Sequence, residues 1–298
     1  MADVERHHSS MHALVFFLSL CLTTTAAMAI NVDSLWDYGK PDVSEKRFRA
    51  ALDGASESER LILQTQIART YGLRREFFKA REVLATVELE LSQASAEVKV
   101  RYFLELGRTY CSPVHSPELR TPENVARARA NFLQAYELAA RARLDYLAID
   151  ALHMMPVVDA DPERQLEWNE KALAYLERSD QPEVKGWEAS LRNNVGHAKR
   201  LKGDYEAALI EFRLSRAVHE RAGRTRNVRI ADWMIARTYR DQKRFGEAIA
   251  IQLDLERAWD VDGDPDFYVF EELEQLYRAV GDEKRAQQYG ERLKARRR

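Results

Sequence analysis

Residues Trp187 to Gly223 have the sequence WEASLRNNVGHAKRLKGDYEAALIEFRLSRAVHERAG. The pattern predicts two antiparallel amphipathic helices joined by a tight turn at Lys202-Gly203-Asp204. Gly196 and Ala208 fall where the two helix backbones approach each other, and Phe212, one turn after Ala208, fills the space between them. Such a helix pair buries only half of its apolar surface, so we expect copies of it on either side.

The copies are visible as an internal repeat. Three nearly identical tetrapeptides stand at the predicted ends of first helices: Ala68-Arg69-Thr70-Tyr71, Gly107-Arg108-Thr109-Tyr110 and Ala236-Arg237-Thr238-Tyr239. Nine residues after Tyr71 and Tyr239 stand Ala80 and Ala248, small residues that suit a close helix contact. Ala128 and Phe132 match Ala208 and Phe212 but come nine residues late, so the second repeat carries an insertion.

This pattern resembles the tetratricopeptide repeat, whose signature is L-G-x2-Y followed by an alanine and A-x3-F. Leu106-Gly107-Arg108-Thr109-Tyr110 matches the first part, and Ala208 with Phe212 matches the last. The resemblance covers about Ser44 to Lys294, with repeats longer than the usual length of about 34 residues. It implies an all-α fold, an α-solenoid of about six helix-turn-helix pairs plus an end helix, forming one domain over residues 30–298.

The predicted helices follow the apolar periodicity. Before the central pair and in the third repeat they are Ser44–Ala55, Leu61–Tyr71, Glu76–Leu91, Lys99–Tyr110 and Pro162–Glu177. Pro156 stands where the repeat tyrosine belongs and is expected to end or kink the first helix of the third repeat. The insertion Ser112–Pro122 holds three of the eight prolines and is expected to be a loop, either a binding element or a surface elaboration.

Composition excludes some classes of partner. The 298 residues include 46 basic and 48 acidic side chains, so the chain has no large net charge that would attract nucleic acid or a membrane surface. With 12 glycines and 8 prolines, the chain favours long helices with short connections over a β protein with many turns.

The N-terminus resembles a secretory signal. Ala13–Leu22 is a short apolar run, and Ala27-Met28-Ala29 places small residues at the −3 and −1 positions of a cleavage site. We therefore expect a signal peptide over residues 1–29 and an exported protein, periplasmic or secreted, without a membrane span after cleavage. An uncleaved anchor and a true start at Met11 are the alternatives. Cleavage leaves Cys111 as the only cysteine, and we expect it to be a small buried residue.

No motif for catalysis or for a cofactor is found. The chain lacks a phosphate loop, a nucleophile elbow, a His-Glu-x-x-His motif and a cysteine cluster. His153-Met154-Met155 is interpreted as core packing rather than a copper site. Asp260–Asp266 resembles a calcium loop only faintly, since Pro265 holds the place of its invariant glycine, and is interpreted as an acidic loop before a helix starting near Asp266. We expect no enzyme, no cofactor and no metal.

The resemblance implies a ligand groove. In the family, the first helix of each repeat lines a concave surface, and residues near the small residue face the ligand. Carried over residue by residue, this assigns nine groove residues: Arg69, Arg108, Asn193, Asn194, His197, Arg200, Trp233, Arg237 and Arg240. A column of guanidiniums with amides and one aromatic suits acidic side chains or a peptide carboxylate. Alternatively, the arginines pair with acidic residues of the next repeat and hold the stack together.

The sequence therefore predicts a non-catalytic exported scaffold that holds a protein or peptide, with acidic groups, in its concave groove. Two alternatives stay open. The first is an intracellular regulator that senses a peptide or small molecule, and the second is an accessory subunit of an enzyme complex. Nucleic acid is not an expected partner.

Overall fold

A computed structural model describes residues 30–296 of the chain, so the expected signal peptide over residues 1–29 lies outside the described residues. From Val32 onward the described residues belong to one compact unit. Within the described residues every regular element is helical. The elements are η1 (Val32–Leu35), α1 (Pro41–Ala51), α2 (Glu57–Leu73), α3 (Phe77–Glu88), α4 (Ala96–Tyr110), η2 (Pro117–Leu119), α5 (Pro122–Arg141), α6 (Asp145–Met154), η3 (Met155–Val157), α7 (Pro162–Arg178), η4 (Pro182–Trp187), α8 (Glu188–Leu201), α9 (Tyr205–Arg221), α10 (Thr225–Asp241), α11 (Phe245–Val261), α12 (Phe267–Ala279) and α13 (Glu283–Arg296).

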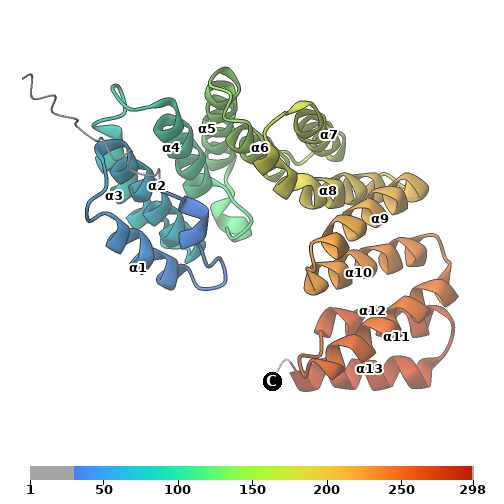
Figure 1. Cartoon of the computed structure of the whole chain (residues 1–298). Coiled ribbons are helices and arrows are strands. Elements are labelled where there is room, and N and C mark those ends of the chain that lie inside the picture. Colours follow the sequence, from blue (N-terminus) through green and yellow to red (C-terminus); the bar gives the residue numbers. More distant parts are fainter. Residues whose placement is uncertain (1–29, 297–298) are drawn as a thin grey trace, which may run out of the picture. The chain divides into compact units, whose positions relative to one another are not determined.

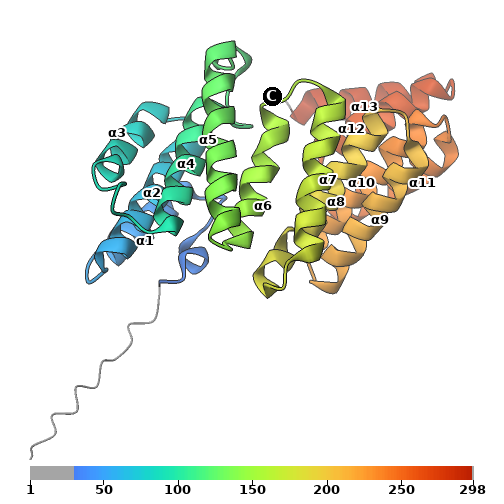
Figure 2. The ribbon, with the colours of Figure 1, turned by 90° about the horizontal axis from the view of Figure 1, so that it is seen from above.

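The helices after α1 form six consecutive antiparallel pairs, from α2 with α3 to α12 with α13. Each helix packs on the next along the chain (Figure 1). First helices also contact the first helix of a neighbouring pair, as α2 does with α4 and α10 with α12. Figure 2 shows the pairs following one another broadly in chain order. The expected all-α solenoid of about six pairs plus an end helix is confirmed, with α1 as the end helix.

The central pair packs as its sequence predicts. A Cβ placed on Gly196 of α8 would lie 2.9 Å from the ring of Phe212 and 3.2 Å from the carbonyl oxygen of Ala208. Ala208 and Phe212 are both fully buried. Gly203 has a φ of +82° in the turn between α8 and α9, a conformation that glycine adopts without strain. A larger residue at Gly196 would separate the two helices.

The second pair repeats this packing despite the insertion. A Cβ on Gly107 of α4 would lie 2.6 Å from the Phe132 ring of α5, closer than any real Cβ contact. Ala128 and Phe132 are fully buried, as expected from their match to the central pair. The insertion therefore lengthens the connection from α4 to α5 and leaves the contact between the two helices intact.

The insertion loop is held at several points. Ser112 N donates to His115 Nδ1 at 3.1 Å, and His115 Nε2 donates to the Thr109 carbonyl at 3.2 Å. The imidazole also stacks on Phe77, with ring centroids 3.8 Å apart. The loop ends where α5 begins, because Pro122 occupies a first-turn position and Thr121 caps the helix. Cys111, just before the loop, is fully buried, as predicted.

Several helix boundaries differ from those predicted by periodicity. Helix α2 starts at Glu57, four residues before the predicted Leu61, because Ser56 and Glu59 form a capping box. Helix α4 starts at Ala96, since Ser95 accepts a hydrogen bond from Val98 N. Apolar periodicity does not register these polar first turns. Helix α1 runs from Pro41 to Ala51 instead of Ser44 to Ala55, α2 ends at Leu73 instead of Tyr71, and α3 ends at Glu88 instead of Leu91. The start of α3 and the end of α7 differ from the prediction by one residue.

The third pair shows the effect of Pro156. Helix α6 ends at Met154 and continues only as the 3-10 turn η3, as the missing amide hydrogen of proline predicts. Met154 and Met155 are buried in the core, which agrees with their interpretation as packing residues. Helix α7 follows from Pro162, capped by Asp161. Among residues 30–296, every helix is too short or too polar to cross a bilayer.

Candidate functional site

The first helices α2, α4, α6, α8, α10 and α12 carry the residues that the sequence assigned to a groove, and their common side is called the groove face here. The nine predicted residues do not form one continuous column. Arg69 and Arg108 join one cluster of charges on α2, α4 and α6. Arg200, Arg237 and Arg240 join a second cluster on α8, α10 and α12.

The N-terminal ion cluster consists of Arg69, Glu105, Arg108 and Asp150. Arg108 donates to Glu105 on its own helix and to Asp150 on α6, both at 2.5 Å. Arg69 Nη1 donates to Glu105 Oε1 at 3.2 Å, so α2, α4 and α6 are joined through their side chains. Two guanidiniums face two carboxylates, and the cluster is electrically balanced.

Attraction outweighs burial in this cluster. Burial raises the pKa of Asp150, but Arg108 and Arg69 lower it by more. The pKa of Asp150 therefore lies below its usual value. Burial likewise lowers the pKa of Arg108, while Asp150 and Glu105 raise it above its ordinary value. Both groups are therefore held in their charged forms. Removing one partner would leave the other buried without compensation.

The segment before α1, residues 30–40, is called the lead-in here and covers the N-terminal ion cluster. The Arg69 guanidinium carbon lies 5.7 Å from the ring centroid of Trp36 and 5.5 Å from that of Tyr38. The two rings stack on each other at 4.6 Å, and Trp36 Nε1 donates to Gln66 Oε1 on α2 at 3.1 Å. A groove position that the family pattern assigns to ligand is thus covered by this chain's own aromatic residues.

The C-terminal ion cluster consists of Arg200, Arg237, Arg240, Asp241 and Glu272. Arg200 on α8 donates to Asp241 on α10. Arg240 Nη1 lies 2.8 Å from Glu272 Oε2, and Arg237 Nε lies 3.1 Å from Glu272 Oε1, joining α10 to α12. Arg240 also donates to the Gln275 side chain. Three guanidiniums share two carboxylates here, which leaves one positive charge in excess within the cluster.

Burial outweighs attraction in this second cluster. Burial raises the pKa of Glu272 despite Arg240 and Arg237, and burial lowers the pKa of Arg237 despite Glu272. His197 on α8 also has a lowered pKa, first from burial and then from Arg200 and Arg237. The imidazole is therefore neutral at pH 7 and adds no charge. Arg200 and Arg240 also lower the pKa of Arg237, in line with the excess of positive charge among these five side chains.

Aromatic side chains flank the C-terminal ion cluster on α10 and α12. The Arg237 guanidinium carbon lies 4.7 Å from the Trp233 ring, and Trp233 meets Tyr268 edge to face at 5.9 Å. Tyr268 is 50% exposed and Phe267 is 38% exposed, so this group is open to solvent. Arg237 itself keeps 28% of its side chain exposed. An aromatic surface beside an accessible guanidinium suits a peptide ligand.

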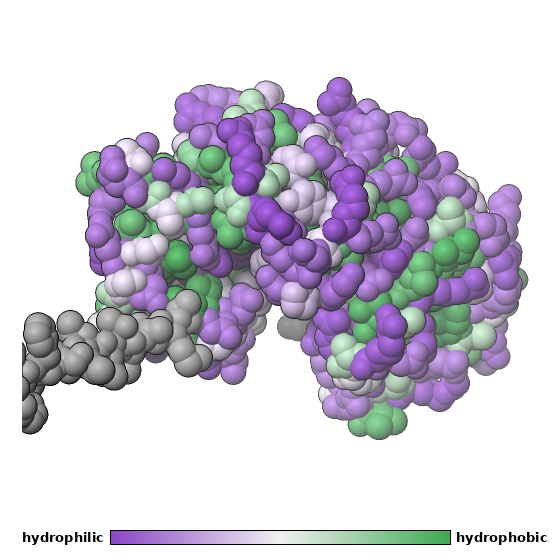
Figure 3. Space-filling view, turned by 45° about the horizontal axis from the view of Figure 1, so that its top comes forward, coloured by the Kyte–Doolittle hydropathy of each residue, from purple (hydrophilic) through white to green (hydrophobic). Residues whose placement is uncertain are grey.

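Exposed apolar residues are also frequent in this half of the molecule. Figure 3 shows a face on which hydrophobic residues gather toward the C-terminal side, among hydrophilic ones. From α9 to the turn after α12 the exposed large hydrophobic residues are Ile210, Leu214, Ile230, Val261, Phe267, Tyr268 and Val280. Apolar surface bordered by polar residues is typical of protein interaction sites.

The two clusters are separated at the junction of α6 and α8. Asn194 Nδ2 lies 3.2 Å from His153 Nδ1, and the His153 ring lies 5.1 Å from that of Trp187. The 3-10 turn η4, which ends at Trp187, contacts both α6 and α8. Asn193 is partly buried on α8. The predicted residues Asn193 and Asn194 therefore lie between the clusters.

Two adjoining hollows lie beside the N-terminal ion cluster, and together they are called the Trp187 hollow. The first has a volume of about 290 Å³ and is bounded by α2, α4, α6, the insertion loop and Trp187. The second has about 270 Å³ and is bounded by the lead-in, α2, α4, α6 and Trp187. Arg69, Asp150 and Trp187 border both. Sequence reasoning did not identify this site.

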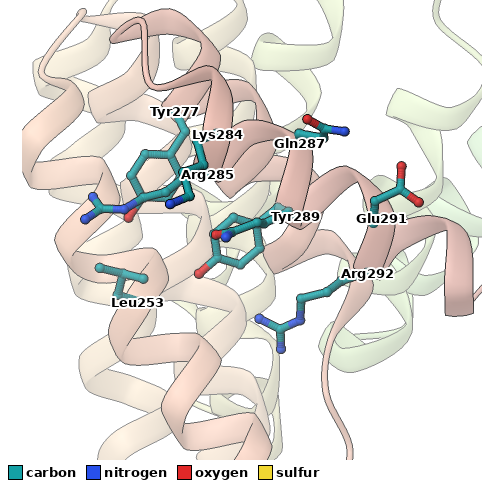
Figure 4. Close-up of a pocket in the computed structure, with 9 residues that line it drawn as sticks. Leu253, Tyr277, Lys284, Arg285, Gln287, Tyr289, Glu291 and Arg292 are labelled. Carbon is teal, nitrogen blue, oxygen red and sulfur yellow. The ribbon is translucent and has the colours of Figure 1, made fainter.

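A larger hollow, of about 940 Å³, lies at the other end of the molecule, where α13 meets α11 and α12. Figure 4 shows Tyr277 and Tyr289 at its centre, with Arg285 near the first ring and Arg292 near the second. The two tyrosine rings stack at 5.7 Å, and Tyr289 donates to Glu256 at 2.8 Å. Arg292 and Arg285 pair with Glu256 and Asp282. Its two arginines are thus paired with acidic residues outside the lining, and none of the nine predicted residues lines it.

Acidic residues of the loop before α12 form an ion pair and a helix cap within the fold. Arg229 pairs with Asp262 at 2.6 Å, and Asp266 accepts a hydrogen bond from Tyr268 N as the cap of α12. The predicted helix start near Asp266 is confirmed. Among the described residues, no group of three or more His, Cys, Asp or Glu side chains is arranged to hold a metal.

Comparisons with known proteins agree with the fold. The search against protein-family models gives no match, and no curated protein matches either. Among solved structures, tetratricopeptide-like repeats of a putative kinesin light chain from Podosopora anserina are 16% identical, with 70% of this chain and 99% of that chain covered and a TM-score of 0.53.

Two further solved structures cover more of this chain. A signal transduction ATPase with numerous domains (STAND) and a tetratricopeptide repeat sensor, from Pyrococcus horikoshii, is 12% identical, with 87% of this chain covered and a TM-score of 0.65; this chain spans 39% of its length. NprR in complex with its cognate peptide NprX is 12% identical, with 88% of this chain and 76% of that chain covered and a TM-score of 0.51. At such identities the similarity shows the fold alone, a tetratricopeptide-like solenoid.

Proposed function

We propose that this protein is a non-catalytic exported scaffold that holds a protein or peptide bearing acidic groups on its groove face, at the C-terminal ion cluster. The observation that carries the proposal is the charge imbalance of that cluster. Three guanidiniums share the carboxylates of Asp241 and Glu272, and Arg237 remains partly exposed. A ligand carboxylate would supply the missing negative charge.

The surroundings suit a peptide carboxylate. Arginine binds carboxylates through two parallel hydrogen bonds, each worth about 1.5–3 kcal/mol when charged. Trp233 and Tyr268 offer flat apolar surface beside Arg237, on which the neighbouring peptide residues can lie. Partial burial strengthens the attraction by lowering the local dielectric constant.

The solved structures support a peptide as the ligand. NprR, which has a similar fold, is described in complex with a peptide. That role belongs to NprR, and we extend it to this chain because the groove face offers charged and aromatic groups for the same purpose. The residues that would contact the ligand are assigned from this chain's own geometry.

Binding can be tested with a pair of fluorescent peptides, one rich in Asp and Glu and one with Asn and Gln at the same positions. We expect only the acidic peptide to bind, with an affinity that falls as salt increases. Arg237→Gln should weaken binding about tenfold. The matched control is Arg257→Gln on the second helix α11, whose arginine is 69% exposed and pairs with Asp254. Equal binding of both peptides would contradict the proposal.

Export is part of the proposal and rests on the apolar run Ala13–Leu22 followed by Ala27-Met28-Ala29. We expect mature protein isolated from its native host to begin at Ile30, and Ala29→Arg to block processing because the −1 position accepts small residues only. N-terminal sequencing of both forms checks this. Mature protein that begins at Met1 or Met11 would contradict export by this route.

A further inference from the structure

The Trp187 hollow differs in chemistry from the C-terminal ion cluster. Its apolar wall consists of Leu73, Pro113, Val114, Met154 and Trp187. The four side chains of the N-terminal ion cluster pair with one another, two guanidiniums with two carboxylates, and the second part adds Asp33 and Arg101, of which Arg101 pairs with Glu97. A charged ligand would lose its hydration here without gaining a free counter-charge, so the hollow favours an uncharged ligand.

Three polar atoms on the lining residues lack hydrogen-bond partners within the described part of the chain. They are Arg69 Nε, Glu105 Oε2 and Trp187 Nε1, two donors and one acceptor. Native proteins leave few buried polar atoms unpaired, and such atoms mark places where water or a ligand completes the bonding. Glu105 is 3% exposed, so its free oxygen is costly without a donor.

We propose that the Trp187 hollow binds an uncharged apolar residue of a peptide through its backbone amide. The amide carbonyl accepts from Trp187 or Arg69, and the amide N–H donates to Glu105. The side chain packs against Pro113, Val114 and Met154. Since the three polar atoms are buried, binding includes a small rotation of the side chains that carry them. The inference rests on the proposed function only in taking a peptide as the ligand.

The dimensions fit a ligand of this size. Volumes of about 290 and 270 Å³ lie at the lower limit of small-molecule sites, which span about 300–1,000 Å³. One amino-acid residue, rather than a long segment, therefore fills one part. The insertion loop supplies Pro113 and Val114, and its anchoring by His115 and Arg120 keeps this wall in place.

Three small probes separate the charge states of the ligand: N-acetyl-L-leucinamide is neutral, N-acetyl-L-leucine is an anion and L-leucinamide is a cation. Ligand-observed saturation transfer on the full chain gives their affinities, and the Trp187 indole N–H resonance gives the location. We expect the neutral probe to shift this resonance to saturation, and both charged probes to bind at least about tenfold more weakly.

Gly72 allows the hollow to be filled. It lines the first part, and a Cβ added there meets no atom within 4 Å. Gly72→Leu should therefore fold normally and bind the neutral probe at least about tenfold more weakly. Gly246→Leu on α11 is the matched control, since Gly246 also has open space around its Cβ and lies outside the hollow. Trp187→Phe, which keeps a ring and removes the donor, should weaken the probe several-fold.

Three results would overturn the inference: failure of the neutral probe to shift the Trp187 resonance, charged probes that bind equally well, or an unchanged affinity in Gly72→Leu. The acidic peptide serves as a separate readout. Gly72→Leu should bind the acidic peptide with the affinity of the unmodified protein. Arg237→Gln should bind the acidic peptide more weakly and the neutral probe with unchanged affinity. The two proposals can thus fail independently.

Discussion

Arg69 and Arg237 occupy the same place in two copies of the tetrapeptide Ala-Arg-Thr-Tyr, yet their surroundings differ. Arg69 lies under Trp36 and Tyr38 in a cluster whose charges balance. Arg237 lies beside Trp233 in a cluster with one guanidinium in excess. The comparison teaches that a repeated residue acquires its role from the segments packed on it, and that stacking and binding can divide one column of arginines.

The pKa shifts show the same contrast. Asp150 in the N-terminal ion cluster is stabilised as a carboxylate by Arg108 and Arg69 against the effect of burial. Glu272 in the C-terminal ion cluster is disfavoured as a carboxylate by burial in spite of Arg240 and Arg237. The first cluster is therefore expected to stabilise the stack, whereas ligand binding at the second is the proposed function.

The largest expected effect comes from neutralising one carboxylate in each cluster. Asp150→Asn should lower the free energy of unfolding by about 3–5 kcal/mol, because the buried Arg108 loses one of its two carboxylate partners and keeps only Glu105. Glu272→Gln should change it by at most about 1 kcal/mol, since the glutamine removes a charge that burial disfavours and can still accept hydrogen bonds. Urea titration of both variants measures the difference. Equal losses would remove the distinction between the clusters.

A second comparison concerns the two glycines at helix contacts. Gly107→Ala should lower the free energy of unfolding by about 1–3 kcal/mol, and Gly196→Ala by less, because the added Cβ meets Phe132 at 2.6 Å but Phe212 at 2.9 Å. Gly72→Ala, with open space around the new methyl, should instead stabilise the protein by about 0.5–1 kcal/mol. Thermal unfolding of the three variants gives the order. A stabilising Gly107→Ala would show that α4 and α5 are not in close contact.

The helix contacts could be predicted from sequence because they depend on local spacing. Gly196 and Phe212 lie within one helix pair, and the period of 3.6 residues per turn fixes which side chains meet. The end of α6 was also predictable, since Pro156 cannot continue a helix. Helix starts were less accurate, because a cap such as Ser56 acts before the apolar pattern begins.

The composition of the two clusters could not be predicted from local pattern. Glu105 pairs with Arg69 and Glu272 pairs with Arg237 across one repeat, and acidic residues are frequent along the sequence. The cover of Trp36 over Arg69 and the position of Trp187 depend on the path of non-helical segments, which periodicity does not specify.

The two clusters should also respond oppositely to pH. The pKa of Asp150 lies below its usual 3.8 in the folded state, so its stabilisation is present above pH 3.8 and is lost as the pH falls through the folded-state value. The pKa of Glu272 lies above its usual 4.5, so its contribution is present below pH 4.5 and is lost as the pH rises through the folded-state value.

Each proton changes stability by at most about 1.4 kcal/mol per pH unit. Asp150→Asn should therefore flatten the stability profile below pH 3.8, and Glu272→Gln should flatten it above pH 4.5. Unfolding free energies measured from pH 3 to pH 7 test both statements. If Glu272→Gln steepened the loss above pH 4.5, the raised pKa assigned to the buried Glu272 carboxyl would be wrong.

The division between stacking and binding is tested most directly by comparing Arg69→Gln with Arg237→Gln, which change the same repeat position in the two clusters. Unfolding free energy and affinity for the acidic peptide are measured on each variant. We expect Arg69→Gln to lower stability and leave the affinity unchanged, and Arg237→Gln to weaken the peptide about tenfold, or about 1.4 kcal/mol, while stability changes by less than about 1 kcal/mol. A stability loss in Arg237→Gln with unaltered peptide affinity would contradict the account.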